Sequence, residues 1–241
     1  MTDNSDSPRI VCMCGKDIGY GIAGFLLDQK AEVRFVINEY ETRGQWYRTP
    51  RELDIIEIAE DEIAEYNPDL IIVAFYDRIL PESIYTIPSL GCWNLHLGDT
   101  ERYRGAYPNI WALRNGDTTY AVTLHRINAG IDTGDILAKR TFPISQMTIG
   151  RNLYDMMVAE GMKLFQECYN DLISRKALQK TRTQNSTDAV THYRKELSHE
   201  VHPPEEFINS VRALTFPPFP PPHFMIGERR FIIVEDKIEK H

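Results

Sequence analysis

The sequence predicts an α/β fold with a mostly parallel sheet and a small C-terminal β-hairpin. A short apolar run at residues 9–14 is followed by a helical pattern at 17–30 and a second strand at 33–38, an opening that is typical of parallel sheets. Residues 69–75 are nearly all apolar, as expected for a strand buried on both faces of such a sheet. The apolar residues at 223–234 flank a Gly-Glu pair, which predicts the hairpin.

The remaining elements follow in the order that an α/β chain requires. Strands are predicted at 91–96, 120–127 and 135–142, and helices at 59–66, 81–87, 108–115, 148–175 and near 205–214. The composition changes after residue 175, where Lys, Thr and Pro become frequent. We therefore expect a core over 1–180 and a C-terminal part over 181–241, which holds a loop, the short helix and the hairpin.

Charge and composition exclude several classes of protein. The formal net charge of −8 and the pI of about 5.4 argue against a broad basic face, so no nucleic-acid partner is expected. The four cysteines, Cys12, Cys14, Cys92 and Cys168, lack the spacing of a zinc site or a redox pair, and no metal is expected. The first residues are polar, and no long apolar run exists, which predicts a cytoplasmic protein without a membrane partner.

Asn94 and His96 form the densest polar group within an apolar segment. They lie at the end of a predicted strand, where open α/β sheets bind ligands, and alternation places both on one face. An amide can stabilise an oxyanion while an imidazole moves a proton, which suits acyl transfer. Asp132, on a Gly-flanked turn, is the candidate that orients the imidazole. Taken alone, such a pair at a strand end is more often structural than catalytic.

The stretch from residue 94 to residue 137 changes this balance, because it resembles the folate-dependent formyltransferases. The matching features are Asn94 and His96, Tyr103-Arg104-Gly105, Pro108, Asn115-Gly116, Val122-Thr123 with His125, and Asp132-Thr133-Gly134-Asp135-Ile136. Together these spaced matches are far more specific than an isolated Asn-x-His. The resemblance covers about the first three-quarters of the chain.

The resemblance implies a Rossmann-like catalytic core, 10-formyltetrahydrofolate as the formyl donor, and Asn94, His96 and Asp132 as catalytic residues. The implied donor-binding residues lie on two loops and one strand, and they are Arg78, Ile79, Leu80, His125, Ala129, Gly130 and Asp132. The chain departs from the family pattern at residues 98–101, which are more polar than usual. That departure affects the expected folate contacts of this loop and not the chemistry.

Three amines are candidate acceptors: a nucleotide-linked amino sugar, initiator methionyl-tRNA and a purine ribonucleotide precursor. The tRNA-directed enzymes carry a C-terminal barrel, for which the residues after Asn185 are too few, and the negative charge also disfavours tRNA. The tail at 212–224 resembles that of sugar N-formyltransferases, which act in surface polysaccharide (O-antigen, lipopolysaccharide) biosynthesis. On this resemblance we expect a dTDP-linked sugar, with a GDP-linked sugar such as GDP-perosamine as the alternative. A non-catalytic nucleotide-sugar binding module and a formate-releasing hydrolase are further alternatives.

Several residues are candidates for acceptor binding. Arg212 could clamp a diphosphate through two hydrogen bonds, and Phe219 and Phe224 could stack on a base or wall a sugar pocket. The other candidates are Trp46, Tyr47, Tyr76, Asp77, Tyr103 and Arg104. A rigid Pro-rich linker with aromatic core residues is the alternative interpretation of the tail. Because an isolated hairpin is marginally stable, we expect residues 223–234 to dock on the core or on a second subunit, and we predict a homodimer.

Overall fold

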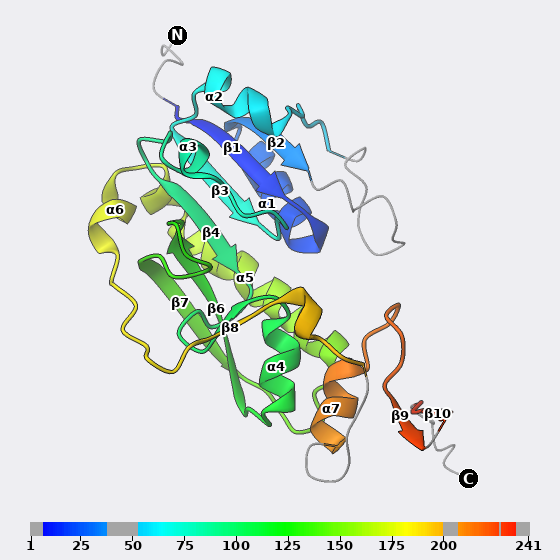
Figure 1. Ribbon diagram of the computed structural model, residues 1–241. Coiled ribbons are helices and arrows are strands. Elements are labelled where there is room, and N and C mark those ends of the chain that lie inside the picture. Colours follow the sequence, from blue (N-terminus) through cyan, green and yellow to red (C-terminus); the bar gives the residue numbers. More distant parts are fainter. Residues whose placement is uncertain (1–6, 38–52, 200–206, 227, 235–241) are drawn as a thin grey trace.

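The computed structural model describes residues 7–37, 53–199, 207–226 and 228–234. Its central sheet is built from β1 (Arg9–Cys14), β2 (Glu32–Ile37), β3 (Leu70–Ala74), β4 (Cys92–His96), β6 (Thr119–Arg126) and β7 (Ile136–Pro143). The strand order is β2-β1-β3-β4-β6-β7. The first four strands are parallel neighbours, whereas β6 and β7 run antiparallel to theirs, as Figure 1 shows. The predicted α/β class and the order of its elements are confirmed.

The helices and short strands complete the described part of the chain. The α-helices are α1 (Lys16–Asp28), α2 (Ile63–Tyr66), α3 (Glu82–Tyr85), α4 (Pro108–Arg114), α5 (Gly150–Leu172), α6 (Lys176–Lys180) and α7 (Phe207–Leu214). Two single turns, η3 (Glu60–Glu62) and η4 (Arg194–Glu196), are 3-10 helices. The short strands are β5 (Tyr103–Gly105), β8 (Val190–His192), β9 (His223–Ile226) and β10 (Arg229–Ile232).

The sheet separates two apolar layers, and β1 shows how the sequence builds them. Ile10 and Cys12 face the layer that holds α1 and α5, whereas Val11 and Met13 face the layer that holds α2 and α3. All four side chains are fully buried, because alternate residues of a strand point to opposite faces. Figure 1 shows α1 and α5 on one side of the sheet and α2 and α3 on the other. This core fixes the strand ends on which the polar residues lie.

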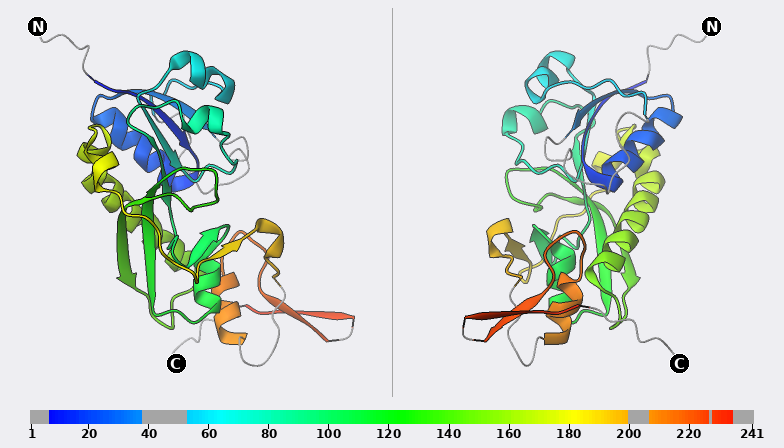
Figure 2. Two further views of the ribbon diagram at one scale, coloured as in Figure 1. Left: turned by 60° about the vertical axis from the view of Figure 1, so that its left-hand side comes forward. Right: turned by 90° about the vertical axis from the view of Figure 1, so that its right-hand side faces the viewer.

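The C-terminal part first packs against the core and then ends in a hairpin that projects from it. β8 pairs in parallel with β5, although the two strands are far apart in the sequence, and α7 packs against α4. β9 and β10 then form the predicted antiparallel hairpin, in which Phe224 stacks on Phe231 with ring centroids 5.2 Å apart. Figure 2 shows this hairpin projecting away from the rest of the molecule. The hairpin exposes apolar side chains, with Ile226 at 60% and Ile232 at 55%.

Candidate active site

Asn94 and His96 lie on β4, in the interior of the sheet between β3 and β6. Asn94 stands opposite His125 of β6, and His96 stands opposite Thr123. Because the two residues are two positions apart on one strand, their side chains point to the same face. The apolar residues around them on β4, Trp93 and Leu95, are fully buried. The amide and the imidazole are therefore held on a buried strand that is paired on both sides.

Asp132 reaches this pair from the turn between β6 and β7. One carboxylate oxygen, Oδ1, accepts a hydrogen bond from Asn94 Nδ2 at 3.1 Å, and the other, Oδ2, lies 3.4 Å from His96 Nδ1. The backbone N–H of Gly105 also donates to Oδ2 at 2.8 Å. Asp132 has a φ of +51°, a left-handed conformation that is uncommon for a residue other than glycine. The predicted convergence of Asn94, His96 and Asp132 is thus present in the structure.

The side-chain amide of Asn94 has a partner for each of its N–H groups. One partner is Asp132, and the other is Nε2 of His125 at 3.2 Å. Nδ1 of His125 lies 2.9 Å from the backbone carbonyl of Arg126, to which it donates. A neutral imidazole with its proton on Nδ1 can accept at Nε2, so His125 and Asp132 together fix the orientation of the Asn94 amide.

His96 is buried and faces an acceptor on both sides. Nε2 donates to the backbone carbonyl of Tyr103 at 3.0 Å, while Nδ1 faces the Asp132 carboxylate. Pro108 and Gly98 close the site nearby, since a Cβ at Gly98 would meet both the His96 ring and the Pro108 ring. Gly98 thus permits the close approach of the backbone to the imidazole.

Asp132 carries its negative charge despite its burial. Burial alone would raise its pKa, but the nearby imidazoles of His96 and His125 and the hydrogen bond from the backbone N–H of Gly105 outweigh burial and hold the pKa well below its usual range. A carboxylate that stays ionised can orient an imidazole and stabilise its cationic form. The centre therefore combines an amide donor, an imidazole and a permanent anion, which is the set that acyl transfer to nitrogen requires.

The loop after β3 carries predicted donor-binding residues and also Tyr76, which was expected to bind the acceptor. Tyr76 donates to Glu60 at 2.5 Å, and Arg78 lies 3.6 Å from the same carboxylate. Ile79 is 77% exposed, whereas Leu80 is buried in the layer under α3. Tyr76, Arg78 and Glu60 line a hollow of about 840 Å³ beside the end of β2.

The second donor-binding segment is the turn after β6. Ala129 and Gly130 are exposed on it, and Asn128 stabilises the turn by accepting hydrogen bonds from Gly130 N and Thr133 Oγ1. His125, which was also expected to bind the donor, is buried and contacts the side-chain amide of Asn94.

Two expected acceptor-binding side chains have other partners. Arg212 is buried, and its guanidinium donates to the carbonyls of Thr148 at 3.0 Å and Ser145 at 2.8 Å and to Asn209 at 3.0 Å. In this structure the guanidinium that was expected to clamp a diphosphate bonds to protein acceptors and ties α7 to the segment before α5.

Tyr103 also differs from the expectation. Its side chain is buried, and its hydroxyl donates to Asp117 and accepts from Asn115, both at 2.9 Å. Tyr103 contacts the site with its backbone carbonyl, which accepts a hydrogen bond from His96, and not with its phenol.

The other acceptor-binding candidates are more dispersed. Asp77 lies 3.4 Å from Arg194 of η4, and Arg104 donates to the carbonyl of Thr100 at 2.8 Å. Phe219 is 46% exposed, whereas Phe224 is part of the hairpin. Trp46 and Tyr47 lie outside the described residues.

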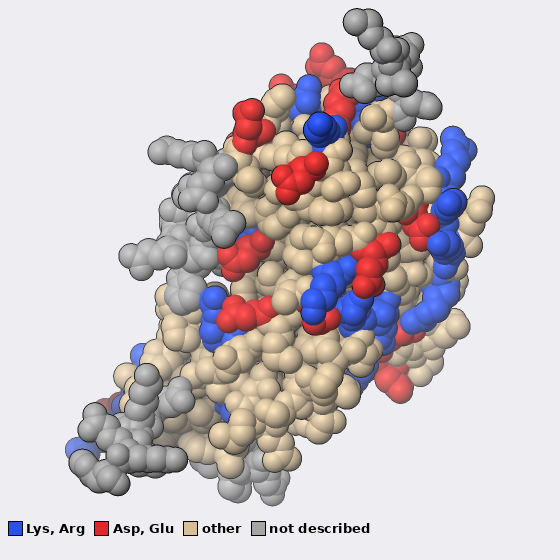
Figure 3. All heavy atoms as spheres, turned by 180° about the vertical axis from the view of Figure 1, so that it is seen from behind, with Lys and Arg blue, Asp and Glu red and all other residues tan. Residues whose placement is uncertain are grey.

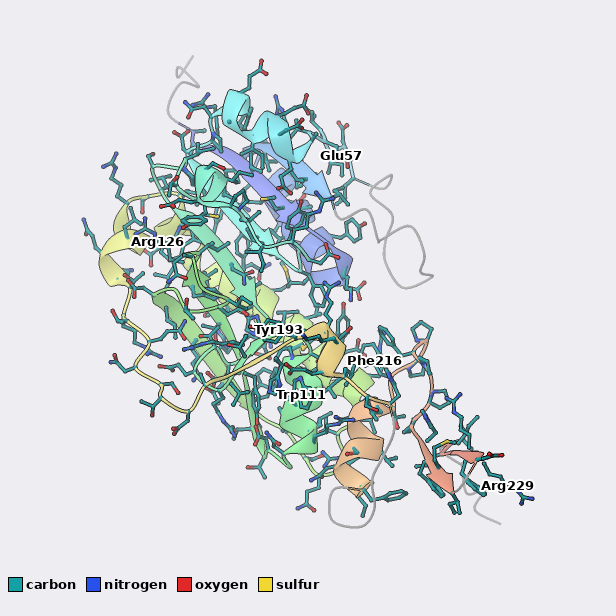
Figure 4. The ribbon with its side chains drawn as sticks, viewed as in Figure 1. Glu57, Trp111, Arg126, Tyr193, Phe216 and Arg229 are labelled. Carbon is teal, nitrogen blue, oxygen red and sulfur yellow. The ribbon has the colours of Figure 1, made fainter. Side chains whose placement is uncertain are left out.

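Sequence reasoning missed the segment at 182–196, which lies across the site and is called the strap here. Gln184 of the strap contacts the turn that carries Asp132. Farther along, His192 stacks on Trp111 of α4 with ring centroids 4.1 Å apart, next to the half-exposed Tyr193; Figure 4 labels Trp111 and Tyr193. The strap has no motif or periodicity that would mark it, because the three residues of β8, an isolated backbone pairing at Arg182 and single side chains make its contacts.

Three further observations concern the surface charges, metal ligands and helices of the described residues. On the face that Figure 3 shows, basic and acidic side chains are interleaved, and α5 carries pairs such as Arg151–Asp155 and Lys163–Glu160. In the described ranges, no three His, Cys, Asp or Glu side chains are placed to hold a metal ion. Within the same ranges, no helix combines the length and the apolar character needed to cross a bilayer.

Comparison with known proteins defines the class to which this fold and site belong. Residues 10–168 match the formyl transferase family, and the chain belongs to that family. Among curated relatives, the methionyl-tRNA formyltransferase of Geobacter sulfurreducens is 35% identical over 161 residues, which cover 64% of this chain and 50% of the relative. The corresponding protein of Agathobacter rectalis is 42% identical over 102 residues, or 42% of this chain and 33% of the relative. The chain thus spans about half the length of the curated relatives it matches.

Solved structures share the fold over most of this chain. WlaRD, a sugar 3N-formyltransferase determined with dTDP and 5-N-formyl-tetrahydrofolate, has a TM-score of 0.78 at 22% identity and covers 89% of this chain and 81% of its own. The N-formyltransferase of Helicobacter canadensis, in complex with folinic acid and dTDP-3-aminofucose, has a TM-score of 0.79 at 21% identity and covers 91% and 84%. The methionyl-tRNA formyltransferase of Clostridium thermocellum has a TM-score of 0.64 at 16% identity and covers 95% and 92%. The Rossmann-like formyltransferase fold is confirmed.

Proposed function

We propose that this protein transfers the formyl group of 10-formyltetrahydrofolate to the amine of a nucleotide-linked amino-dideoxy sugar. The observation that carries the formyl chemistry is the contact of Asn94 and His96 with the ionised Asp132. The family to which residues 10–168 belong supports the same chemistry. The solved structures named with dTDP or a dTDP-linked sugar and a formyl-folate support both substrates.

The reaction follows from the roles of the three residues. The uncharged acceptor amine attacks the formyl carbon, and the oxygen of that carbon becomes negative. The amide of Asn94 stabilises this oxyanion. His96 accepts the proton that the amine loses and returns a proton to the leaving nitrogen, so that its net charge is restored. Asp132 stabilises the cationic imidazole throughout. For this, Asn94 must exchange one of its present partners for the oxyanion, and Nε2 of His96 must release the Tyr103 carbonyl and accept the proton while Nδ1–H faces Asp132.

The donor and acceptor are proposed to occupy opposite sides of this centre. Arg78, Ile79 and Leu80 on one loop, and the turn at 129–132 on the other, are proposed to hold the pterin. The acceptor is proposed to lie toward the C-terminal part, at 181–241, near Arg104 and Phe219. With Arg212 used inside the fold, the diphosphate contact has to come from other residues.

A panel of acceptors tests the proposal. The protein is incubated with 10-formyltetrahydrofolate and, separately, with dTDP-4-amino, dTDP-3-amino and GDP-4-amino dideoxy sugars, methionyl-tRNA and a purine ribonucleotide amine. Mass spectrometry then detects the addition of one formyl group. Formylation of a dTDP-linked sugar is the expected result. Formylation of methionyl-tRNA alone, which the curated relatives favour as the second candidate, would overturn the sugar acceptor and retain the chemistry.

We also propose that the protein is a cytoplasmic homodimer that contributes to surface polysaccharide biosynthesis. The hairpin supports the dimer, because it projects from the molecule (Figure 2) and exposes Met225, Ile226, Phe231 and Ile232. Exposed apolar side chains gathered on one small element are typical of an interface. The occupant proposed for this surface is the hairpin of a second copy.

A further inference from the structure

The strap is anchored on both sides of Gln184. Arg182 exchanges two backbone hydrogen bonds with Ile136 of β7, at 2.8 and 2.9 Å, and its guanidinium donates to both carboxylate oxygens of Glu101, at 2.7 and 2.8 Å. Ser186 donates to the carbonyl of Glu101 at 2.6 Å. These contacts hold residues 182–186 against the core whether or not Gln184 takes part. The side chain of Gln184 is thus presented to the turn after β6 from a fixed backbone.

Gln184 bonds to two backbone carbonyls of the turn that carries Asp132. Its Nε2 donates to the carbonyl of Asp132 at 3.0 Å and to the carbonyl of Gly134 at 2.7 Å, while its Oε1 accepts from Arg104 at 3.1 Å. Arg104 precedes Gly105, whose N–H donates to the Asp132 carboxylate. One amide therefore connects the two segments that together orient this carboxylate.

The backbone of Asp132 needs such support. Its left-handed φ of +51° is unfavourable for a residue with a Cβ and persists only where neighbouring groups hold it. Gly134 is packed against the Arg126 carbonyl so closely that no Cβ fits there, which fixes one end of the turn. The two N–H groups of Gln184 fix the direction of the carbonyls, and through them the peptide planes that aim the Asp132 side chain.

We propose that Gln184 is a positioning residue of the reaction: it holds the turn so that the Asp132 carboxylate faces His96 and Asn94. Gln184 has no described contact with His96 or Asn94 and acts through Asp132. The alternative is that Gln184 only fastens the strap to the core. The positioning role predicts that a variant which loosens the strap at another residue keeps its turnover, whereas the fastening role predicts that it loses turnover as a Gln184 variant does. The inference rests on the proposed formyl transfer, and its test includes a measurement that does not.

Two nearly isosteric substitutions separate the bonds. Gln184→Glu keeps an acceptor for Arg104 but removes both N–H donors to the Asp132 and Gly134 carbonyls, and Gln184→Met removes all three hydrogen bonds. Gln179→Glu makes the same chemical change at an exposed position of α6 and serves as the matched control. Arg182→Ala weakens the strap without contact to Asp132. Steady-state kinetics with an accepted acceptor, thermal unfolding, and the side-chain NMR resonances of ¹⁵N-labelled His96 without substrates are measured for each.

We expect both Gln184 variants to lower kcat about 10- to 100-fold, because small misplacement of a reacting group has effects of this size. The KM for the formyl donor should change less than about threefold, as for a residue that acts mainly in the transition state. The His96 resonances should move in both Gln184 variants and stay in place in Gln179→Glu and Arg182→Ala.

If Arg182→Ala lost as much kcat as the Gln184 variants, Gln184 would only fasten the strap to the core, and the proposal would be overturned. Normal turnover in Gln184→Glu would also overturn it, since only the Arg104 link would then matter. If the wild type formylates nothing in the panel, the proposed function fails. Unmoved His96 resonances would then reject this inference separately.

Discussion

Replacing Asn94 by Ala removes one side chain with two separable effects. In the structure its amide donates to Asp132 at 3.1 Å and to His125 at 3.2 Å, and in the reaction it is proposed to donate to the oxyanion. The substitution therefore removes a transition-state donor and leaves two buried acceptors with one partner fewer. Asp132 retains the N–H of Gly105, so its carboxylate remains partly compensated.

The loss of catalysis and the loss of folding stability have different expected magnitudes. Loss of one oxyanion donor costs about 3–4 kcal/mol in the transition state, so kcat should fall about 100-fold or more. A buried acceptor without its donor costs about 1–3 kcal/mol in the folded state. For a chain of this size each kcal/mol lowers the unfolding midpoint by roughly 2–4 °C. Asn94→Ala should thus remain folded at room temperature while it loses nearly all turnover.

The assay is initial-rate formyl transfer at saturating donor and acceptor, combined with thermal unfolding of the same samples. Asn170→Ala, on the exposed face of α5, is the matched control and should behave as the wild type in both. The KM for the donor should stay within about threefold, because the lost interaction belongs to the transition state. A variant that is folded and retains a third or more of the wild-type kcat would refute the oxyanion role of Asn94.

Three further predictions concern the rest of the molecule. Arg182 and Lys139 outweigh the opposing effect of burial and lower the pKa of Glu101 to about 2. Because a lowered folded-state pKa stabilises the protein above the unfolded value and this stabilisation is lost as the pH falls, Glu101→Gln should be less stable than the wild type in urea at pH 7 and nearly equal to it near pH 2. Arg212→Met should lower the free energy of unfolding by about 2–4 kcal/mol and leave the acceptor KM within about twofold; a large rise in KM with normal stability would restore the diphosphate role. Phe231→Lys should convert the proposed dimer to a monomer in light scattering, whereas Met147→Lys, on an exposed loop, should not; a wild type that is monomeric at micromolar concentration would contradict the dimer.

The sequence predicted the elements of the core well, because their patterns report burial directly. β3 is an uninterrupted apolar run and is buried at every position, and α1 buries Ile18, Ile22 and Leu26, which recur every four residues. Strand alternation placed Asn94 and His96 on one face, and the structure brings both to Asp132. Their catalytic role stays a prediction until the variants are measured.

The partners of single polar side chains were predicted poorly, because the residue type does not determine which of several possible partners a side chain contacts in the fold. Arg212 has the chemistry of a phosphate ligand, but its guanidinium can equally donate to backbone carbonyls. In the fold it is buried next to the carbonyls that precede α5 and bonds to them. Tyr103 lies next to the site, yet its phenol has partners in Asp117 and Asn115. In both cases the tertiary position, which no local pattern encodes, determines the role.

The strap shows where family resemblance stops being informative about the site. The residues that match the family end at 168, whereas the amide that bonds to the Asp132 turn belongs to Gln184. The geometry of the motif is therefore completed by a segment outside the motif, through a β5–β8 pairing that spans the sequence distance from 103 to 192. Because this segment also contacts Asp77 of the donor loop through Arg194, one stretch of chain touches both the proposed donor loop and the catalytic turn. Substitution of Gln184 should therefore change turnover although it is not one of the three catalytic candidates, whereas Arg182→Ala, which leaves the bonds of Gln184 to the turn in place, should not.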